Sequence, residues 1–266
     1  MNSYVRQSGI VSGGSRLWTP EDDPNVVLRL QGQDATTITE VANKVSAWAD
    51  KSGFGNDATE STLKPTTNVQ TIDGKNAIDF NNPVDERLNV AHDSSLNFDA
   101  LNGYGVFLMT NLHGYTNQGG TTNQILSKGS TSQGLTIWLG STNNIGFISG
   151  AGDQLVHSSI NNHGSDILLT CYYNRDTETT KIRINGGSQE TKTSSTGLSN
   201  NALALIISAQ NDPVRYCDQH IAELIIVKGA VDGEPRKLIE GFLAWEYGTE
   251  SLLPSDHKYK NAPPRI

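Results

Sequence analysis

The sequence has few cysteines and no long apolar run. No segment of the 266 residues approaches the roughly 20 apolar residues that a membrane-spanning helix needs. The two cysteines are too few for a disulfide framework, so we predict that Cys171 and Cys217 are buried free thiols. The first residues lack the continuous apolar core of a secretory signal, which favours folding in a cytoplasm. The net charge of −8 gives no general attraction to nucleic acid or anionic membrane.

Sequence patterns typical of catalysis are also missing. Glycosidases on β-sandwich folds usually place carboxylates at alternate positions of one strand, whereas the strongest strand here carries only Glu223. The six histidines form neither an HExxH motif nor a His-x-His pair, so there is no local zinc signature. Neither a nucleophile elbow nor a phosphate-binding glycine loop occurs. We therefore predict a protein that is not an enzyme and keep a glycan-cleaving enzyme as a minor alternative.

What the sequence does contain is many short β-strands. Charged residues make up 18%, and Gly, Ser, Thr, Asn and Gln are abundant, which favours turns and polar strand faces. Segments rich in β-branched and aromatic residues recur between these turn residues. The predicted strands are Val26–Gln31, Asn76–Phe80, Arg87–Val90, Tyr104–Thr110, Asn123–Lys128, Gly134–Gly140, Asn144–Ser149, Asp166–Asn174, Thr180–Gly186, Ala202–Ala209 and His220–Gly229.

One helix is expected near the C-terminus. Apolar residues recur at helical spacing over 232–247, and we expect the helix to cover the end or edge of the sandwich. Asp232 is the expected N-cap, Pro235 fits the first turn, and Gly248 can close the end. The predicted organisation is an N-terminal arm (1–24), a β-sandwich that includes the helix (25–250) and an extended proline-containing tail (251–266).

The stretch WADKSGFGNDAT, from Trp48 to Thr59, concentrates turn residues and oxygen donors. Asp50 and Asp57 are candidate calcium ligands, because hard cations take several oxygens from loops. Asp, Asn and Gly also build ordinary turns, and the spacing is not that of an EF-hand. We favour the structural interpretation, in which no cofactor is bound and calcium is the alternative.

Two further sets of residues are candidates for binding. Saccharide sites combine an aromatic face with nearby amides and carboxylates, and two loop-like regions offer such residues. The candidate ligand-binding residues are Tyr115, Asn117, Gln118, Asp212, Tyr216 and Asp218. The arm carries apolar residues that a polar segment has little reason to contain unless they are buried. The candidate partner-binding residues are Tyr4, Val5, Ile10, Val11, Leu17 and Trp18.

Three segments together resemble a known family. These are RLQGQDATTITEVANKVSAWADKSGFGNDAT, the strand GKNAIDF from Gly74 to Phe80, and the C-terminal run from His220 to Pro264 with its EGFLAWEYG helix. They resemble laminin-G-like, concanavalin A-like lectin-glucanase jelly-roll domains of the phage and environmental-bacterial type. The resemblance implies an all-β, concanavalin A-like antiparallel β-sandwich. It also implies that Trp48 packs inside the sandwich and that Asp50 to Gly53 shape the bend after it.

The resemblance and the arm lead to two expectations about function. The first is a phage virion structural protein, a capsid decoration or head-fibre module that is attached through its arm to other virion proteins of the capsid or tail. Such a protein would assemble in the host cytoplasm and could form a homo-oligomer. The alternative is an extracellular, lectin-like module that binds a surface glycan and serves host attachment. Neither interpretation involves nucleic acid or insertion into a membrane.

Overall fold

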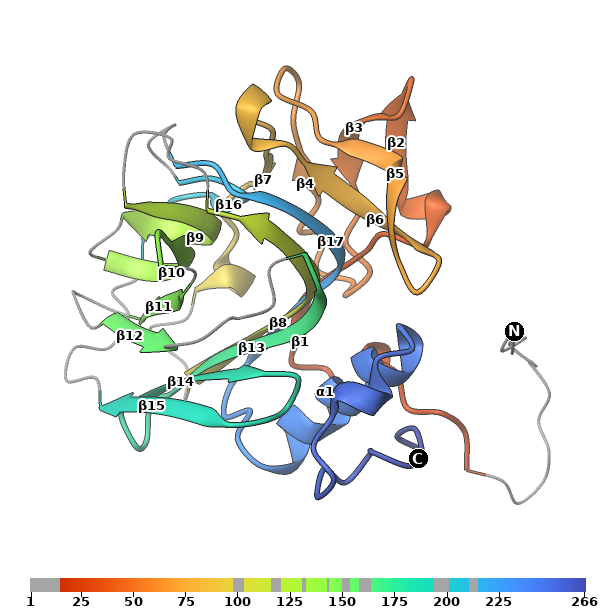
Figure 1. Ribbon diagram of the computed structural model, residues 1–266, viewed down its shortest axis with the longest axis vertical. Coiled ribbons are helices and arrows are strands. Elements are labelled where there is room, and N and C mark those ends of the chain that lie inside the picture. The colour runs from red at the N-terminus through yellow and green to blue at the C-terminus, as the bar shows by residue number, and fades with distance from the viewer. Residues whose placement is uncertain are drawn as a thin grey trace.

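The computed structural model describes residues 15–97, 103–115, 121–130, 133–142, 144–149, 154–157, 164–193, 201–210 and 215–266. These residues form two layers of antiparallel strands around a shared core (Figure 1). The predicted all-β sandwich with one C-terminal helix is therefore confirmed. No described helix has the length and apolar character needed to cross a membrane.

The first layer is built around two long central strands, β8 and β17, which pair with each other. Strand β1 pairs with the other side of β17, while β13, β14 and β15 follow β8 in that order. The strands are β1 (Val26–Gln31), β8 (Gly103–Gly114), β13 (Asp166–Asn174), β14 (Thr179–Ile184), β15 (Gln189–Thr193) and β17 (Asp218–Lys228).

The second layer consists of seven shorter strands that pair in a continuous series. In spatial order they are β4 (Ala58–Thr59), β7 (Leu88–Val90), β16 (Leu205–Ile207), β9 (Thr122–Ser130), β10 (Gln133–Gly140), β11 (Ile145–Ser149) and β12 (Gln154–His157).

A third group of strands joins the two layers at one end of the molecule (Figure 1). Strand β6 pairs with the first residues of β17, while β3 pairs with β4 of the second layer. The group comprises β2 (Ile38–Val41), β3 (Lys44–Trp48), β5 (Thr66–Ile72) and β6 (Lys75–Phe80). The helices are α1 (Glu234–Glu246) and the 3-10 turns η1 (Pro20–Asp22), η2 (Ala35–Thr37), η3 (Asn82–Val84), η4 (Ser94–Leu96) and η5 (Glu250–Leu252).

Strand β8 is buried on both faces. Side chains alternate across a strand, so Val106 and Leu108 point into the core between the two layers. Phe107 and Met109 point the other way and belong to a second apolar cluster beneath α1. The residues from Val106 to Met109 in β8 consequently form an unbroken apolar run, as expected for a stretch of strand that has no solvated face.

Helix α1 therefore covers the outer face of the first layer, and not the end or edge that we expected. Ile239 and Leu243 are fully buried against the strands there. The N-cap position is occupied by Gly233 at φ 74°, so the prediction that Asp232 caps the helix is wrong. The Asp232 carboxylate instead accepts hydrogen bonds from the Tyr172 hydroxyl (3.2 Å) and from the Lys181 amine.

A buried ion pair lies between the first layer and α1. Arg29 of β1 and Glu223 of β17 are both fully buried, and Arg29 Nε donates to Glu223 Oε1 at 2.7 Å. The Tyr247 hydroxyl donates to the other carboxylate oxygen at 2.9 Å, and the guanidinium lies over the Phe242 ring. Burial raises the pKa of the Glu223 carboxyl, and Arg29 opposes that rise. The Glu223 carboxylate thus depends on Arg29 to remain ionised in the core, while the guanidinium also pairs with Glu21.

The C-terminal residues fold back beneath α1, in contrast to the extended tail we predicted. Tyr259 is buried, and Trp245 Nε1 donates to its carbonyl at 2.7 Å. His257 lies 3.3 Å from the buried carboxylate of Glu240. The cysteine prediction is confirmed, because Cys171 and Cys217 are both buried free thiols whose pKa values burial raises.

We expect Arg29→Met to lower the free energy of unfolding by about 3 to 5 kcal/mol, because the buried Glu223 carboxyl would lose its counterion and would have to stay unpaired or be protonated. Urea unfolding followed by tryptophan fluorescence measures this loss. The double variant Arg29→Met/Glu223→Leu should recover most of the loss, because no buried charge is then left unpaired.

Lys258→Met is the control for removing a cation from an exposed ion pair with Glu234. This variant should leave the urea midpoint unchanged. A wild-type midpoint for Arg29→Met would show that the buried pair does not stabilise the fold.

Candidate functional site

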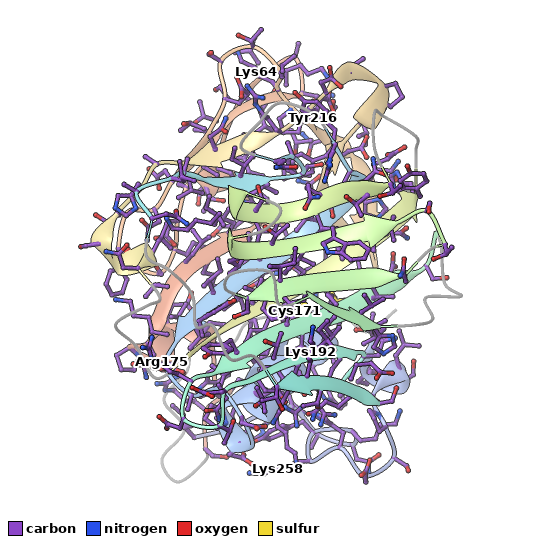
Figure 2. All side chains as sticks on the ribbon, turned by 90° about the vertical axis from the view of Figure 1, so that its left-hand side faces the viewer. Lys64, Cys171, Arg175, Lys192, Tyr216 and Lys258 are labelled. Atoms are coloured by element: carbon purple, nitrogen blue, oxygen red, sulfur yellow. The ribbon has the colours of Figure 1, made fainter. Side chains whose placement is uncertain are left out.

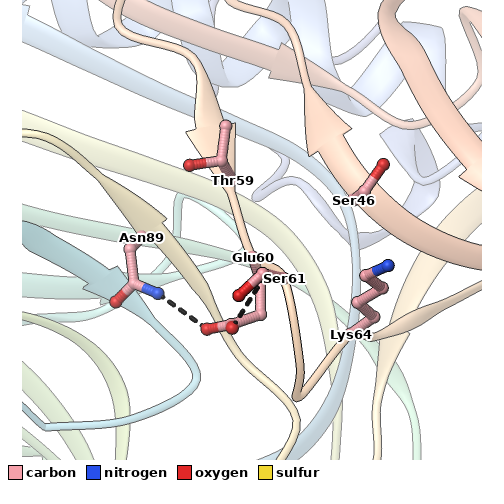
Figure 3. Close-up of a pocket in the computed structure, with 6 residues that line it drawn as sticks. All are labelled: Ser46, Thr59, Glu60, Ser61, Lys64 and Asn89. Carbon is pink, nitrogen blue, oxygen red and sulfur yellow. Dashed lines mark hydrogen bonds between the residues drawn. The ribbon is translucent and has the colours of Figure 1, made fainter.

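An open polar groove lies over the end of the sandwich formed by β3, β4 and β7. Its volume is about 540 Å³ (Figure 3). Strand residues contribute hydroxyl and amide groups, while the turn that follows β4 contributes a carboxylate and an amine. The lining residues are Ser46, Thr59, Glu60, Ser61, Lys64 and Asn89.

Glu60 is held firmly in this groove. Its Oε2 accepts from Asn89 Nδ2 at 2.9 Å and from Arg87 Nε at 3.1 Å. Its Oε1 accepts from the backbone N–H group of Ser61 (Figure 3) and from that of Thr62. Partial burial opposes ionisation, but the hydrogen bonds from Thr62 and Arg87 outweigh it and lower the pKa of Glu60. The carboxylate is therefore charged and already paired.

Lys64 is the unpaired charge of the groove. Within the part of the chain that the structure describes, its amine makes neither an ion pair nor a hydrogen bond. Thr59 and Ser61 add hydroxyl groups that can both donate and accept. The groove thus presents an ammonium group beside neutral hydrogen-bonding groups, which is suited to a polar ligand with an acidic group.

A second polar cluster lies on the outer face of the first layer. It contains Asp79 of β6, His113 of β8 and His220 of β17, whose ligand atoms all lie within 4.8 Å of one another. His113 Nε2 is 2.8 Å from His220 Nδ1, and His113 Nδ1 is 2.7 Å from Asp218 Oδ1. Burial and the neighbouring His113 lower the pKa of His220 to about 4. The hydrogen bond to Asp218 raises the pKa of His113, and burial raises that of Asp79.

The predicted calcium ligands, Asp50 and Asp57, belong neither to the groove nor to the histidine cluster. They make hydrogen bonds within the bend after Trp48. Asp50 accepts four hydrogen bonds, from the backbone N–H groups of Arg29, Ser52 and Asn56 and from the Ser52 hydroxyl. Asp57 Oδ1 accepts from Asp50 N. The Asp50 carboxylate thereby ties the bend after Trp48 to strand β1, which accounts for it as a structural residue. The calcium role of Asp50 and Asp57 stays a prediction.

Three of the predicted sugar-binding residues are described, and they lie where the end of β8 meets the start of β17, because Gly114 pairs with Asp218. Asp218 lies against His113 in the second cluster, while the buried Tyr216 receives a long hydrogen bond from Arg87 (3.4 Å) behind the groove. Tyr115 packs partly against the core. Asn117, Gln118 and Asp212 lie outside the described residues.

Two of the candidate arm residues, Leu17 and Trp18, are described, and they contact this chain itself. Trp18 is buried and packs edge-on against Phe242 of α1, with ring centroids 6.0 Å apart. Leu17 is half-exposed and forms a β-bridge with Arg265. Trp18 thus packs within its own molecule, and its predicted contact with a partner stays a prediction. Tyr4, Val5, Ile10 and Val11 lie outside the described residues.

Sequence reasoning missed the groove and the histidine cluster for the same reason. Glu60 comes from the turn after β4 and Asn89 from β7, and His113 and His220 are 107 residues apart along the chain. Only the pairing of β8 with β17 brings the two imidazoles together. The sequence does contain one feature that could have indicated the histidine cluster: each of the two histidines stands at the polar end of a long apolar strand.

No protein-family model matches the chain, and no curated protein matches its sequence. Several solved structures have a similar fold. The binding domain of Paraclostridial Mosquitocidal Protein 1 has a TM-score of 0.63 at 15% identity, covering 83% of this chain and 52% of that chain. The botulinum neurotoxin serotype G binding domain has a TM-score of 0.62 at 13% identity, covering 85% of this chain and 52% of that chain.

A third similar structure is of botulinum neurotoxin type C, which interacts with two ganglioside molecules. Its TM-score is 0.55 at 13% identity, covering 83% of this chain and 51% of that chain. The present chain thus spans about half the length of these neighbours. At such identities the likeness shows the fold alone, a β-sandwich. The first two neighbours are binding domains rather than catalytic ones. None of the three is a phage protein, so the expected phage type and virion role gain no support from them.

We expect Asp50→Ala to lower the free energy of unfolding by about 2 to 4 kcal/mol, because three backbone N–H groups lose a charged acceptor. Asp50→Asn should lose less, because one oxygen remains. A thermal scan with and without millimolar calcium separates the two interpretations of this bend. We expect calcium to leave the wild-type melting temperature unchanged, and a clear rise would instead show that the bend binds the ion.

Proposed function

We propose that this chain is a non-enzymatic module that binds glycans on a surface, through the groove lined by Glu60, Lys64 and Asn89. The observation that carries the proposal is the composition of that groove, in which hydroxyl, amide and ammonium groups line one open hollow. Sugars present many hydroxyls, which need such mixed donors and acceptors. Neighbours with this fold are binding domains, and botulinum neurotoxin type C interacts with gangliosides, which supports the same class of function.

The charges of the groove favour an acidic sugar. The carboxylate of Glu60 is neutralised by Arg87 at 3.1 Å, so the amine of Lys64 is the charge left for a ligand. An ammonium group pairs with a carboxylate more strongly than with a neutral hydroxyl. A sialic or uronic acid carboxylate beside Lys64 would use this charge, while Thr59 and Asn89 contact ring hydroxyls.

The location of the groove suits contact with a surface. Lys64 lies at one end of the molecule and Lys258, beside the C-terminal residues, lies at the other (Figure 2). A ligand in the groove would therefore approach from the side opposite α1. The virion role and virion localisation stay predictions, and no feature of the described residues favours them over an extracellular binding role.

A glycan array with acidic and neutral glycans tests the proposal. We expect wild-type protein to bind acidic glycans and Lys64→Ala to bind them about 10- to 100-fold more weakly, the loss expected for one charge-assisted contact. Asn89→Ala should weaken both classes, because it removes a neutral contact and releases Glu60.

Lys258→Ala is the matched control, since it removes an exposed lysine at the far end of the molecule. It should bind like the wild type. An array with no signal for the wild type would overturn the proposed function. If Lys64→Ala binds glycans as strongly as the wild type, the glycan site does not lie in this groove.

A further inference from the structure

The cluster of Asp79, His113 and His220 has the chemistry of a metal site. His220 stands directly opposite Asp79 across the β6–β17 pair, so the two side chains share one face of the sheet. The neighbours Ile78 and Ile221 point into the core, which places the carboxylate and the imidazole on the outer face. Imidazole nitrogens and a carboxylate oxygen are the ligands that zinc prefers besides thiolates.

A register shift brings the third residue into this cluster. Strand β8 pairs Gly114 with Asp218 and Leu112 with Gln219, so His113 occupies the position that the pairing skips. Such an extra residue bends a strand and re-aims its side chain. The His113 ring consequently reaches the His220 ring, with centroids 4.9 Å apart.

The spacing of the two rings is close to that of two zinc ligands. His113 Nε2 and His220 Nδ1 are 2.8 Å apart, a hydrogen-bond distance. Two imidazole nitrogens on one tetrahedral zinc ion, each bonded at its usual length, lie about 3.3 Å apart. The rings thus need to separate by only about half an ångström, and the side chain of His113 is 27% exposed at the rim of the cluster.

Carboxylates stand behind both imidazoles, as they do in known zinc sites. His113 Nδ1 contacts Asp218 Oδ1 at 2.7 Å, which leaves its Nε2 facing the cluster. His220 Nε2 lies 3.9 Å from Asp166 Oδ1, and Asn111 Nδ2 holds that carboxylate at 2.9 Å. Metal-bound histidines almost always donate their second ring N–H to such a partner, which fixes the tautomer of the ring.

Two polar groups in the cluster lack a hydrogen-bond partner within the part of the chain that the structure describes. His220 Nε2 is buried and makes no hydrogen bond within the described part of the chain. The Asp79 carboxylate, half-buried, accepts no hydrogen bond from any described residue. With an ion on Nδ1, the His220 proton would sit on Nε2 and face Asp166, and the Asp79 carboxylate would gain a cation.

We propose that Asp79, His113 and His220 bind a divalent transition-metal ion of the zinc class, with Asp166 and Asp218 orienting the two histidines. Three protein ligands leave the fourth tetrahedral position for water or another ligand on the exposed side of His113. The ion would join β6, β8 and β17 where the strands of the first layer meet those of the connecting group. This proposal is independent of the glycan groove.

Zinc titration of the purified full chain, first dialysed against EDTA, tests the site. We expect one zinc ion per chain by calorimetry. The melting temperature should rise by about 5 to 10 °C when free zinc is 100-fold above its dissociation constant. Calcium should give no rise, because it requires an oxygen-rich site. Cobalt in place of zinc should give the visible absorption bands of a tetrahedral ion.

Variants locate the bound ion. His113→Ala and Asp79→Asn should abolish the zinc-dependent rise, and Asp218→Asn should weaken zinc binding about 10- to 100-fold. His92→Ala, outside the cluster, should bind zinc like the wild type. Melting in EDTA shows that each variant is folded. A wild-type chain that binds no zinc, or a folded His113→Ala variant with wild-type affinity, would overturn the proposal.

Discussion

The structure depends on the pairing of strand β17 with its three neighbours. Along its length β17 pairs with β8 on one side, and with β6 and then β1 on the other. Its side chains therefore enter three environments: Ile221, Leu224 and Ile226 pack in the sandwich core, Ile225 and Val227 pack under α1, and His220 lies in the polar cluster. A register slip of one residue would exchange these environments, so register is strongly specified.

The outer face of the first layer combines apolar packing with buried charges. Beneath α1, Glu223 is satisfied by Arg29 and Tyr247, so every oxygen of the carboxylate has a donor. Further along the same face, the cluster of Asp79, His113 and His220 is only partly satisfied by its own groups. Buried polar groups are costly unless they are paired, so the paired carboxylate of Glu223 fits a structural role, while the unpaired groups of the cluster favour a bound ligand.

Sequence patterns were sufficient for the fold but not for the sites. The apolar strands β8, β13 and β17 were predicted, because alternation and β-branched residues mark them directly. Strands β2, β3, β4, β5, β12 and β15 were missed, since they are short or contain polar residues, such as those of TTNVQTI, that do not distinguish an exposed strand from a loop. The groove and the histidine cluster depend on pairings between distant strands, which local spacing cannot reveal. The role of Asp50 in the bend could be predicted from the sequence, because Asp-x-Ser-Gly is a local turn motif.

The pairing of the two ends of the described chain has a mechanical consequence. Trp18 N donates to the Pro264 carbonyl at 3.0 Å, and Ile266 N donates to the Arg16 carbonyl at 2.9 Å. A force that pulls these two ends apart would act first on this small bridge and would open it before the load reached the sheets. The sandwich would thus be shielded from tension along the chain, and its groove would keep its shape while the ends were under strain.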